Sequence, residues 1–160
     1  MIGDIEVREA WAKGLGVYAL RAFEPGEFIF RRRHGRVVRN SELARLGEDD
    51  LRHLCELDFD HSAVLLSPGC YLNHSCGPNA MRSGVKVFAW RPIKAGDEVT
   101  IDYRLNAFGD GEWWDCLCGA PSCTGRVEGS FFGLSEARQR EYLPNAPAFI
   151  RREWRGRHRE

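Results

Sequence analysis

Three cysteines close together near the end of the chain constrain its fold more than any other feature. They follow the spacing C-x-C-x4-C on a segment in which Gly119 and Pro121 favour a tight loop, and they are Cys116, Cys118 and Cys123. Three thiolates at this spacing can bind one metal ion. A structural zinc site needs four such ligands in a tetrahedron, with Zn–S distances of about 2.3 Å. The pattern therefore predicts a small lobe held by zinc, with a fourth ligand from elsewhere in the chain.

The chain offers three further cysteines as the fourth ligand, Cys55, Cys70 and Cys76. Cys76 is preferred because it lies in a polar turn rather than in an apolar pattern. Metal is favoured over disulfides because the first residues lack the basic region and apolar core of a secretory signal, and no apolar run approaches membrane-spanning length. We therefore expect a protein that is not secreted and that works in the cytoplasm or, in a eukaryote, the nucleus.

If Cys76 completes the set, the metal links the lobe to residues 71–79, which read Tyr-Leu-Asn-His-Ser-Cys-Gly-Pro-Asn. These residues follow the apolar run 63–66 and are dense in side chains that hydrogen-bond or bind metal. Polar groups in an apolar setting are costly unless each has a partner. We therefore expect the ion to build a functional site as well as to stabilise the fold.

Three stretches together resemble the SET-domain protein lysine methyltransferases that carry a post-SET zinc lobe. They are Asn-His-Ser-Cys-Gly-Pro-Asn at 73–79, Gly-Asp-Glu-Val-Thr-Ile-Asp-Tyr at 96–103 and the cysteine knuckle at 116–123. Residues 13–16, Lys-Gly-Leu-Gly, are similar to that family's N-terminal G-x-G motif, and residues 25–29 are similar to the segment after it. The likeness covers roughly residues 5–126 in the family's order. Each stretch alone is a modest signal, but three in this order are specific.

The resemblance implies a mainly β fold of the SET-like β-clip type, with small curved sheets, short helices and a C-terminal zinc-binding post-SET lobe. Residues 73–74 would be threaded beneath residues 102–103 as a pseudoknot, which is rare among proteins. The expected segments are a SET domain over 1–105 with a helical insert at about 40–57, a post-SET lobe over 106–130 and a helical extension over 131–160.

The resemblance also implies S-adenosylmethionine as the cofactor and the side-chain amine of a lysine as the methyl acceptor. The cofactor would be bound by Lys13, Gly14, Leu15, Gly16, Asn73, His74 and Leu117. Tyr103 would be the catalytic tyrosine. The zinc ligands would be Cys76, Cys116, Cys118 and Cys123.

Elementary chemistry supports these roles. Methyl transfer from a sulfonium to an amine is an in-line displacement, which needs alignment more than acid or base strength. The lysine must arrive neutral although its free pKa is about 10.4, and a nearby sulfonium charge and a dry channel both lower that pKa. The hydroxyl of Tyr103 can orient the amine without ionising. Asn73 offers both a donor and an acceptor, and glycines let the backbone approach a cofactor closely.

The substrate side departs from the family pattern. Where many relatives read E-Y-x-G-E, residues 32–36 read Arg-Arg-His-Gly-Arg, and Cys70 stands where arginine is frequent. Ile101 occupies the position of a phenylalanine/tyrosine switch, and its aliphatic side chain favours more than one methylation. In the family a peptide adds as a strand, and its lysine enters a narrow channel. The channel candidates are Tyr71, Ile101, Phe131 and Phe132, with Trp113 and Trp114 as further aromatics; covering the lobe is an equally good role for these aromatic residues near the knuckle.

Hydrophobic periodicity predicts short strands over 5–10, 17–20, 28–30, 36–38, 85–89 and 99–101, with a flexible turn at 13–16. Recurring leucines predict helix over 40–57, divided at Gly47. A helix capped by Ser135 and ended by Pro144 follows the lobe, and a last helical segment runs over 147–154. Residues 106–126 show no period.

Composition narrows the function. Lysine plus arginine number 23 and aspartate plus glutamate 23, so the formal net charge is zero and no global field draws the chain to nucleic acid or an anionic membrane. We expect S-adenosylmethionine-dependent methylation of a lysine-containing protein or peptide, with histones and DNA-packaging proteins among the candidates. The alternative is a catalytically inactive SET-like interaction module stabilised by zinc. A nucleic-acid-binding knuckle is weaker, because the lobe is not strongly basic.

Overall fold

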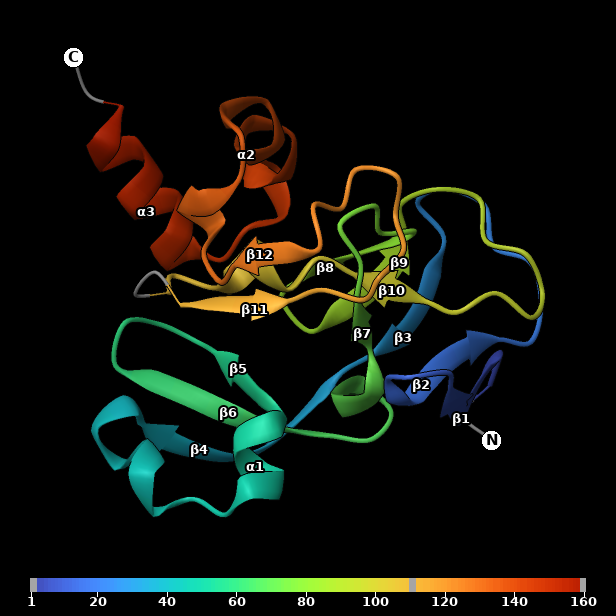
Figure 1. Cartoon of the computed structure of the whole chain (residues 1–160), viewed down its shortest axis with the longest axis horizontal. Coiled ribbons are helices and arrows are strands. Elements are labelled where there is room, and N and C mark those ends of the chain that lie inside the picture. Colours follow the sequence, from blue (N-terminus) through green and yellow to red (C-terminus); the bar gives the residue numbers. More distant parts are fainter. Residues whose placement is uncertain (1–2, 110–111, 159–160) are drawn as a thin grey trace.

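Small sheets of two or three strands make up most of the computed structural model, which describes residues 3–109 and 112–158 (Figure 1). Residues 1–2, 110–111 and 159–160, which belong to the three expected segments, lie outside the described residues. The strands are β1 (Ile5–Ala10), β2 (Gly14–Ala19), β3 (Phe28–Arg31), β4 (Arg33–Arg39), β5 (Leu54–Glu56), β6 (His61–Leu66), β7 (Asn73–His74), β8 (Ala80–Ser83), β9 (Lys86–Ala89), β10 (Thr100–Ile101), β11 (Trp113–Asp115) and β12 (Arg126–Glu128). The α-helices are α1 (Glu48–Arg52), α2 (Glu136–Tyr142) and α3 (Ala148–Arg157), and the 3₁₀ helices are η1 (Asn40–Arg45), η2 (Gly69–Tyr71), η3 (Tyr103–Asn106), η4 (Phe131–Gly133) and η5 (Leu143–Asn145).

The antiparallel pair β1–β2 corrects the expected turn at 13–16. Gly14 pairs with Ala10 and Gly16 with Arg8, so the glycines belong to the strand and the turn lies at 11–13. Ala12 and Gly14 take positive φ values of 61° and 78°. The left-handed conformation reverses the chain at these positions, which leaves Gly16 in an extended segment that faces the rest of the site.

The central sheet β3–β9–β8 carries the first hydrophobic core. Its strands at 28–31 and 86–89 confirm the expected ones, and they pair antiparallel with an irregularity between Phe28 and Phe30. Phe30 and Val87 are buried in this core, together with Val17 and Ile101 from other strands. The core therefore joins the N-terminal pair of strands to β10.

The sheet β4–β6–β5 corrects the helical prediction for residues 40–57. The helical segment is divided at Gly47 as predicted, but it ends at Arg52, and Leu54 begins a strand that pairs with Val64 of β6. The leucine spacing suits a helix, yet the partner strand beside it decides the outcome, because pairing and burial override weak local propensity. In Figure 1 this sheet lies below the C-terminal helices, and its β5–β6 turn contacts α3, because the rings of Phe59 and Phe149 lie edge-on with centroids 5.4 Å apart.

Two strand pairs position the polar stretches. β7 pairs parallel with β10, so that Asn73 lies opposite Thr100 and His74 opposite Ile101. Asn79 strengthens this arrangement, because its side-chain amide donates to the carbonyl of Glu98 at 2.8 Å and accepts from the N–H of Thr100 at 2.9 Å. The pair β11–β12 lies where the sequence showed no period, in residues 106–126 and just beyond.

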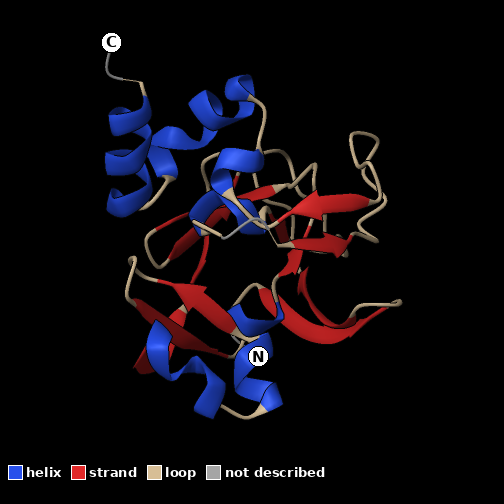
Figure 2. Ribbon diagram, turned by 60° about the vertical axis from the view of Figure 1, so that its left-hand side comes forward, coloured by secondary structure: helices blue, strands red, loops and turns tan. Residues whose placement is uncertain are grey.

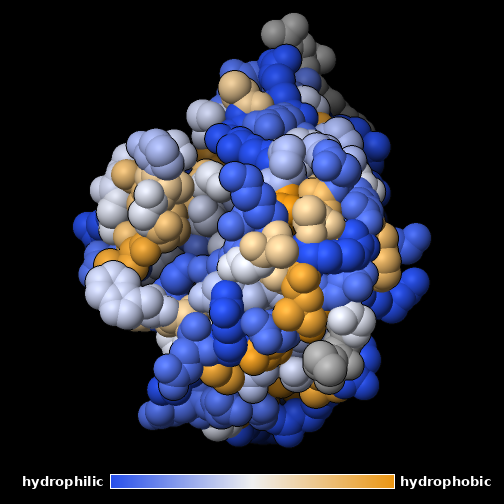
Figure 3. Space-filling view, turned by 90° about the vertical axis from the view of Figure 1, so that its right-hand side faces the viewer, coloured by the Kyte–Doolittle hydropathy of each residue, from blue (hydrophilic) through white to orange (hydrophobic). Residues whose placement is uncertain are grey.

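The C-terminal helices cover a second core (Figure 2). The hydroxyl of Ser135 accepts from the N–H of Arg138 and caps α2, as predicted. α3 extends to Arg157, three residues beyond the predicted segment. Within the described part of the chain, no helix has the length and apolar character needed to cross a membrane. Figure 3 shows a mainly hydrophilic face with small scattered groups of hydrophobic residues.

Candidate active site

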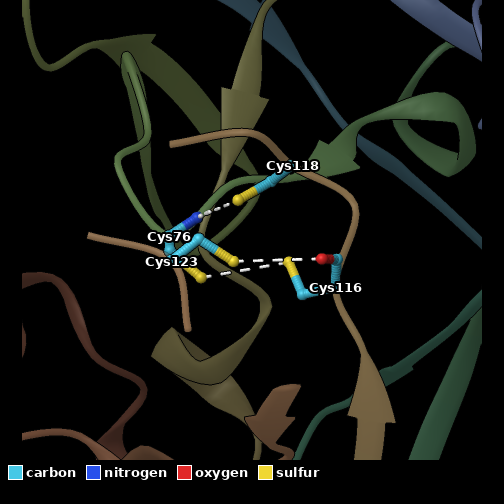
Figure 4. A group of neighbouring side chains, drawn as sticks. All are labelled: Cys76, Cys116, Cys118 and Cys123. Atoms are coloured by element: carbon cyan, nitrogen blue, oxygen red, sulfur yellow. Dashed lines mark hydrogen bonds between the residues drawn. The ribbon is translucent and has the colours of Figure 1, made fainter. Parts of the chain in front are cut away.

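The four cysteines expected to bind metal come together. The sulfur atoms of Cys76, Cys116, Cys118 and Cys123 all lie within 4.8 Å of one another, and they point toward a common centre (Figure 4). In a tetrahedron with Zn–S bonds of about 2.3 Å, the sulfurs would be separated by roughly 3.8 Å. The sulfurs of Cys76 and Cys116 are 3.9 Å apart. The spacing thus suits one tetrahedral ion.

The protonation of the cluster also suits a cation. Burial raises the pKa of Cys76 and of Cys116. Burial would raise that of Cys118 as well, but N–H groups of Cys76 and Ala120 bond its sulfur and lower its pKa to about 6. One thiolate is therefore favoured already, and a bound cation would favour ionisation of the other three.

His74 connects the cysteine cluster to Tyr103. The backbone N–H of Tyr103 donates to Nδ1 of His74 at 3.2 Å, and Nε2 lies 3.3 Å from the sulfur of Cys76. Since Nδ1 accepts, we assign the ring proton to Nε2, which then donates to the sulfur. Burial lowers the pKa of His74 to about 4, which agrees with a neutral ring.

A cavity of about 250 Å³ opens beside this histidine. The structure brings five of the residues predicted for cofactor binding and catalysis to its walls, namely Lys13, Asn73, His74, Tyr103 and Leu117. The same walls include Trp114, whose ring centroid lies 5.5 Å from that of His74. Leu117 is 71% exposed, so an apolar side chain is available at the cavity's edge for a ligand to cover.

Glu98 organises the cavity, and the sequence did not single it out. Its carboxylate bonds the ammonium of Lys13 at 2.5 Å and accepts from the side-chain amide of Asn73 at 2.7 Å. The same amide donates to the carbonyl of Leu15 at 3.0 Å. The signal was present in the Gly-Asp-Glu stretch at 96–98, but only the fold shows that the glutamate crosses to the 13–16 segment.

Gly16 lies where this network is most crowded. A Cβ atom at this position would lie 2.8 Å from Oε1 of Glu98 and 3.1 Å from Nδ2 of Asn73. Leu15 and Gly14 line a neighbouring hollow with Trp11 rather than the cavity itself. A side chain at position 16 would therefore displace Glu98 or Asn73.

Tyr103 is held from both sides. Its hydroxyl donates to the carbonyl of Leu72 at 2.6 Å. The preceding residue, Asp102, is 3% exposed and accepts from Nε and Nη2 of Arg104 at 2.9 and 2.8 Å, which anchors the turn that carries the tyrosine. Tyr103 as a whole is 41% exposed, whereas burial, with a smaller effect of the Glu98 charge, raises the pKa of its hydroxyl to about 12.

A second cavity, of about 280 Å³, is also lined by Tyr103. Its walls include Leu72, Ile101 and Tyr103, and further residues come from β5, β6 and the turn at 69–70. Tyr103 is thus a wall residue common to both cavities.

Several predicted channel residues lie outside the second cavity. Phe131 is fully buried in the C-terminal core, and Phe132 packs against that core. Tyr71 packs against the first core, and its ring lies edge-on to His53 with centroids 5.8 Å apart. Trp113 is 54% exposed and pairs with Glu128 across β11–β12. Of the channel candidates, Ile101 is the one whose side chain lines the described cavity.

Comparison with known proteins agrees with this architecture. The chain is 31% identical over 135 residues to a Candida albicans protein described as a histone-lysine N-methyltransferase, H3 lysine-36 specific. This alignment covers 74% of this chain and 16% of the relative. A Saccharomyces cerevisiae protein of the same description is 32% identical over 136 residues, covering 73% of this chain and 18% of the relative. The chain thus spans less than a fifth of the length of these two relatives.

The fold itself is shared with a solved structure. The methyltransferase domain of the human histone-lysine N-methyltransferase SETMAR superposes with a TM-score of 0.61 at 24% identity, over 79% of this chain and 58% of that one. Residues 14–104 match the SET domain family. This match covers more than half of the chain, and it includes the 13–16 segment almost entirely, the 73–79 stretch and the 96–103 stretch; the chain therefore belongs to the SET domain family.

Proposed function

We propose that this chain is an S-adenosylmethionine-dependent protein lysine N-methyltransferase. The observation that carries the proposal is the position of Tyr103 between two cavities, one lined by Lys13, Asn73 and His74 and the other by Leu72 and Ile101. A methyl transfer needs donor and acceptor in line and close together. Two cavities that meet at one side chain provide that arrangement.

The residues of the smaller cavity suit S-adenosylmethionine. Lys13 and Asn73 offer polar groups to a carboxylate and an ammonium, Glu98 lies behind them, and Leu117 with Trp114 offers apolar surface to an adenine ring. When bound, the cofactor supplies an electrophilic methyl group. We assign cofactor binding to Lys13, Gly14, Leu15, Gly16, Asn73, His74 and Leu117.

The larger cavity suits the side chain of a lysine. Leu72 and Ile101 give its wall apolar surface, and the hydroxyl of Tyr103 donates to the carbonyl of Leu72. An apolar wall disfavours the ammonium form and lowers the pKa of an entering amine. The hydroxyl oxygen of Tyr103 and the carbonyl of Leu72, which are 2.6 Å apart, are acceptors that can orient the two hydrogens of a neutral amine. Tyr103 is the catalytic residue in this proposal.

Zinc in the cysteine cluster is structural in this proposal. The four thiolates would complete its coordination, so no open position remains for chemistry. The ion would hold the 116–123 loop against His74 and thereby close one wall of the cofactor cavity. We assign the SET domain to residues 1–105, the zinc lobe to residues 106–130 and the helical extension to residues 131–160.

The methyl acceptor in this proposal is a lysine-containing protein such as a histone, because both relatives are described as histone-lysine N-methyltransferases.

Transfer of a radiolabelled methyl group from S-adenosylmethionine to core histones and to a lysine peptide array tests the proposal. We expect zinc-loaded protein to label lysine, and Tyr103→Phe to lower kcat by about 100-fold, the size expected when one hydrogen-bonding group at a reacting centre is removed. The matched control is Tyr18→Phe. The ring of Tyr18 packs under the guanidinium of Arg8, so this variant should transfer methyl groups to lysine as the wild type does.

Calorimetric titration of the cofactor separates binding from catalysis. Asn73→Ala should weaken binding, whereas Tyr103→Phe should leave it within about threefold, because a group that acts mainly in the transition state changes kcat rather than ground-state affinity. Cofactor binding without labelling of any histone or array lysine would contradict the proposed activity.

A further inference from the structure

A groove of about 510 Å³ lies between the turn that joins β5 to β6 and the segment that leads into β11 (Figure 1). Three aromatic residues line it: Phe59 from the turn, Phe108 from the segment before β11, and Trp114 from β11 itself. Asp58 and Glu112 bring carboxylates to the same walls. Among the described residues, no lysine, arginine or histidine lines the groove. It therefore combines aromatic surface with negative charge.

The groove adjoins both cavities that are assigned to the reaction. It shares two wall residues with the larger cavity, Leu43 and Glu56, and the carboxylate of Glu56 accepts from the N–H of Phe108 at 2.8 Å. It shares Trp114 with the cofactor cavity. A polypeptide that places a lysine in the larger cavity, beside Tyr103, therefore has its neighbouring residues close to the groove.

The aromatic rings of the groove are fixed in position but not covered. The ring of Phe59 lies edge-on to that of Phe108, with centroids 4.9 Å apart, and edge-on also to that of Phe149. Phe59 nevertheless remains 49% exposed. Trp114 is held by its edge-on contact with His74. Aromatic surface that is fixed and open to solvent is available to a cation, which the electrons of the ring face attract.

The carboxylates of Asp58 and Glu112 can accept hydrogen bonds from a ligand. Backbone N–H groups of Asp60 and His61 bond Oδ1 of Asp58, both at 2.8 Å, and lower its pKa, so this carboxylate is ionised at neutral pH. Both bonds use Oδ1, which leaves Oδ2 for another donor. Glu112 is exposed, and within residues 3–109 and 112–158 no cation pairs with it. The groove thus offers two carboxylate acceptors alongside its aromatic surface.

We propose that this groove is a specificity subsite for an arginine that flanks the target lysine of the substrate. This assignment rests on the proposed function, because it takes the larger cavity as the place of the target lysine. Arginine suits the groove better than lysine does, since a planar guanidinium stacks on aromatic rings and donates to more than one carboxylate at once. A glutamate at the same substrate position would meet the like charges of Asp58 and Glu112.

The charges of the two spaces determine which side chain enters which. Arg32 and Arg52 line the larger cavity, whereas the groove has no basic residue on its described walls. A guanidinium cannot lose its charge in a protein, so the arginines of the larger cavity disfavour its entry there. A lysine can enter as the neutral amine, because its pKa falls in such surroundings. The arginine of the substrate is thus directed to the groove and the target lysine to the cavity beside Tyr103.

Fluorescence anisotropy of labelled peptides tests the subsite in zinc-loaded full chain without requiring turnover. Each peptide carries one central lysine in a background of alanine and serine, and a single arginine occupies each flanking position in turn. Arginine at the position that reaches the groove should tighten binding about tenfold relative to alanine, as expected for a guanidinium that is both stacked and paired. Lysine at that position should give a smaller gain, and glutamate should weaken binding.

Substitution of Glu112 separates recognition from a structural effect. Glu112→Gln removes the charge and should reduce the preference for arginine, and Glu112→Lys should reverse it, so that glutamate is preferred at the same substrate position. Asp60→Asn is the matched control: Asp60 belongs to the same turn as Asp58 but does not line the groove, so the preference for arginine should be unchanged. If Glu112→Lys does not fold, Glu112→Gln combined with Asp58→Asn replaces it.

The outcomes distinguish this subsite from the proposed activity. Equal affinity for every flanking residue, or a preference for arginine that survives both the Glu112 variants and Asp58→Asn, would overturn the subsite. Methyl transfer to lysine with no dependence on flanking arginine would leave the activity established and the subsite wrong. A preference for arginine that Glu112→Lys reverses, in a protein that transfers no methyl group, would leave the groove established as a guanidinium site and the proposed function wrong.

Discussion

Gly16 lies where β2 packs closely against the side chains of Glu98 and Asn73. Because an added Cβ would lie 2.8 Å from Glu98 and 3.0 Å from the Cβ of Ala10, Gly16→Ala must displace part of the network that orients Asn73. We expect a loss of about 1–3 kcal/mol in unfolding free energy and about tenfold weaker cofactor binding in calorimetry.

Gly47→Ala is the matched control for this substitution. Gly47 has a φ of −70°, and a Cβ added there would meet no heavy atom within 4 Å, so alanine should be accommodated. The unfolding free energy and cofactor affinity of this variant should match those of the wild type. If Gly16→Ala also behaved like the wild type, the close packing of β2 against Glu98 would not be required for binding.

The hydroxyl of Tyr103 should remain protonated well above neutral pH. Burial, with a further effect from the charge of Glu98, raises its pKa to about 12. The neutral phenol is thus favoured in the folded state, and this stabilisation is present below pH 10, the usual pKa of tyrosine, and is lost as the pH rises through the folded-state value.

Ultraviolet titration can follow this ionisation. The phenolate absorbance of the wild type and of Tyr103→Phe should coincide up to about pH 10.5, as expected for a residue that has not yet ionised. Circular dichroism should confirm that both proteins remain folded over that range. A difference of one tyrosine with a midpoint near pH 10 would show that the hydroxyl is open to water.

Single residues also show where sequence reasoning ends. The 73–79 motif and the four cysteines were predictable, because their chemistry is written in residue type and spacing. Glu98 was not, because its role depends on a bond to Lys13 that spans 85 positions in the sequence. The burial of the arginines at 32 and 82, which are 3% and 4% exposed, was equally invisible, because it depends on how distant segments pack.

At the scale of elements, the cysteine cluster joins β7 and its following turn to the loop between β11 and β12. Chelation of the metal should therefore loosen this loop and the wall that it forms beside His74. If free zinc exceeds its Kd a thousandfold, binding contributes about 4 kcal/mol, and its removal should lower Tm by roughly 8–16 °C for a chain of this size.

Thermal unfolding with and without a chelator measures this change, and metal analysis should give one zinc per chain. Cys70→Ser is the matched control: it removes a cysteine outside the cluster, so it should retain the zinc and the shift on chelation. Cys118→Ser should lose both. A Tm that does not respond to chelation in a zinc-loaded sample would contradict a structural role for the ion.

Secondary structure was predictable where the sequence of the element itself specifies it and no distant strand intervenes. The capped helix after Ser135 and strands at 28–30 and 85–89 were predicted, since a cap and an alternating pattern are local properties, and the observed strands are 28–31 and 86–89. The strand at 54–56 and the hairpin of β11 and β12 were not. The first is specified by the neighbouring β6, and the second lies beside a cluster of thiols that local periodicity cannot describe.

At the scale of the whole molecule, the division into three sequence segments does not coincide with the cores. The second core combines Met81 of β8 and Leu105 of η3 with Phe131 and with Tyr142 and Ile150 of the C-terminal helices. The hydroxyl of Tyr142 also donates to the carboxylate of Asp102 at 3.3 Å, and Asp102 directly precedes Tyr103 in the chain. The proposed helical extension is therefore packed into the structure that supports the site.

This shared core predicts that zinc-loaded protein unfolds in one cooperative transition. In scanning calorimetry the calorimetric and van't Hoff enthalpies should agree, as expected for two-state unfolding. Ile150→Ala should lower the unfolding free energy by about 2–5 kcal/mol because it leaves a cavity in the core, and it should shift the whole transition rather than split it. Arg152→Ala, an exposed neighbour on α3, should leave the transition unchanged. Two separate transitions, with only one affected by Ile150→Ala, would mean that the C-terminal helices fold as an independent unit and that the site does not depend on them.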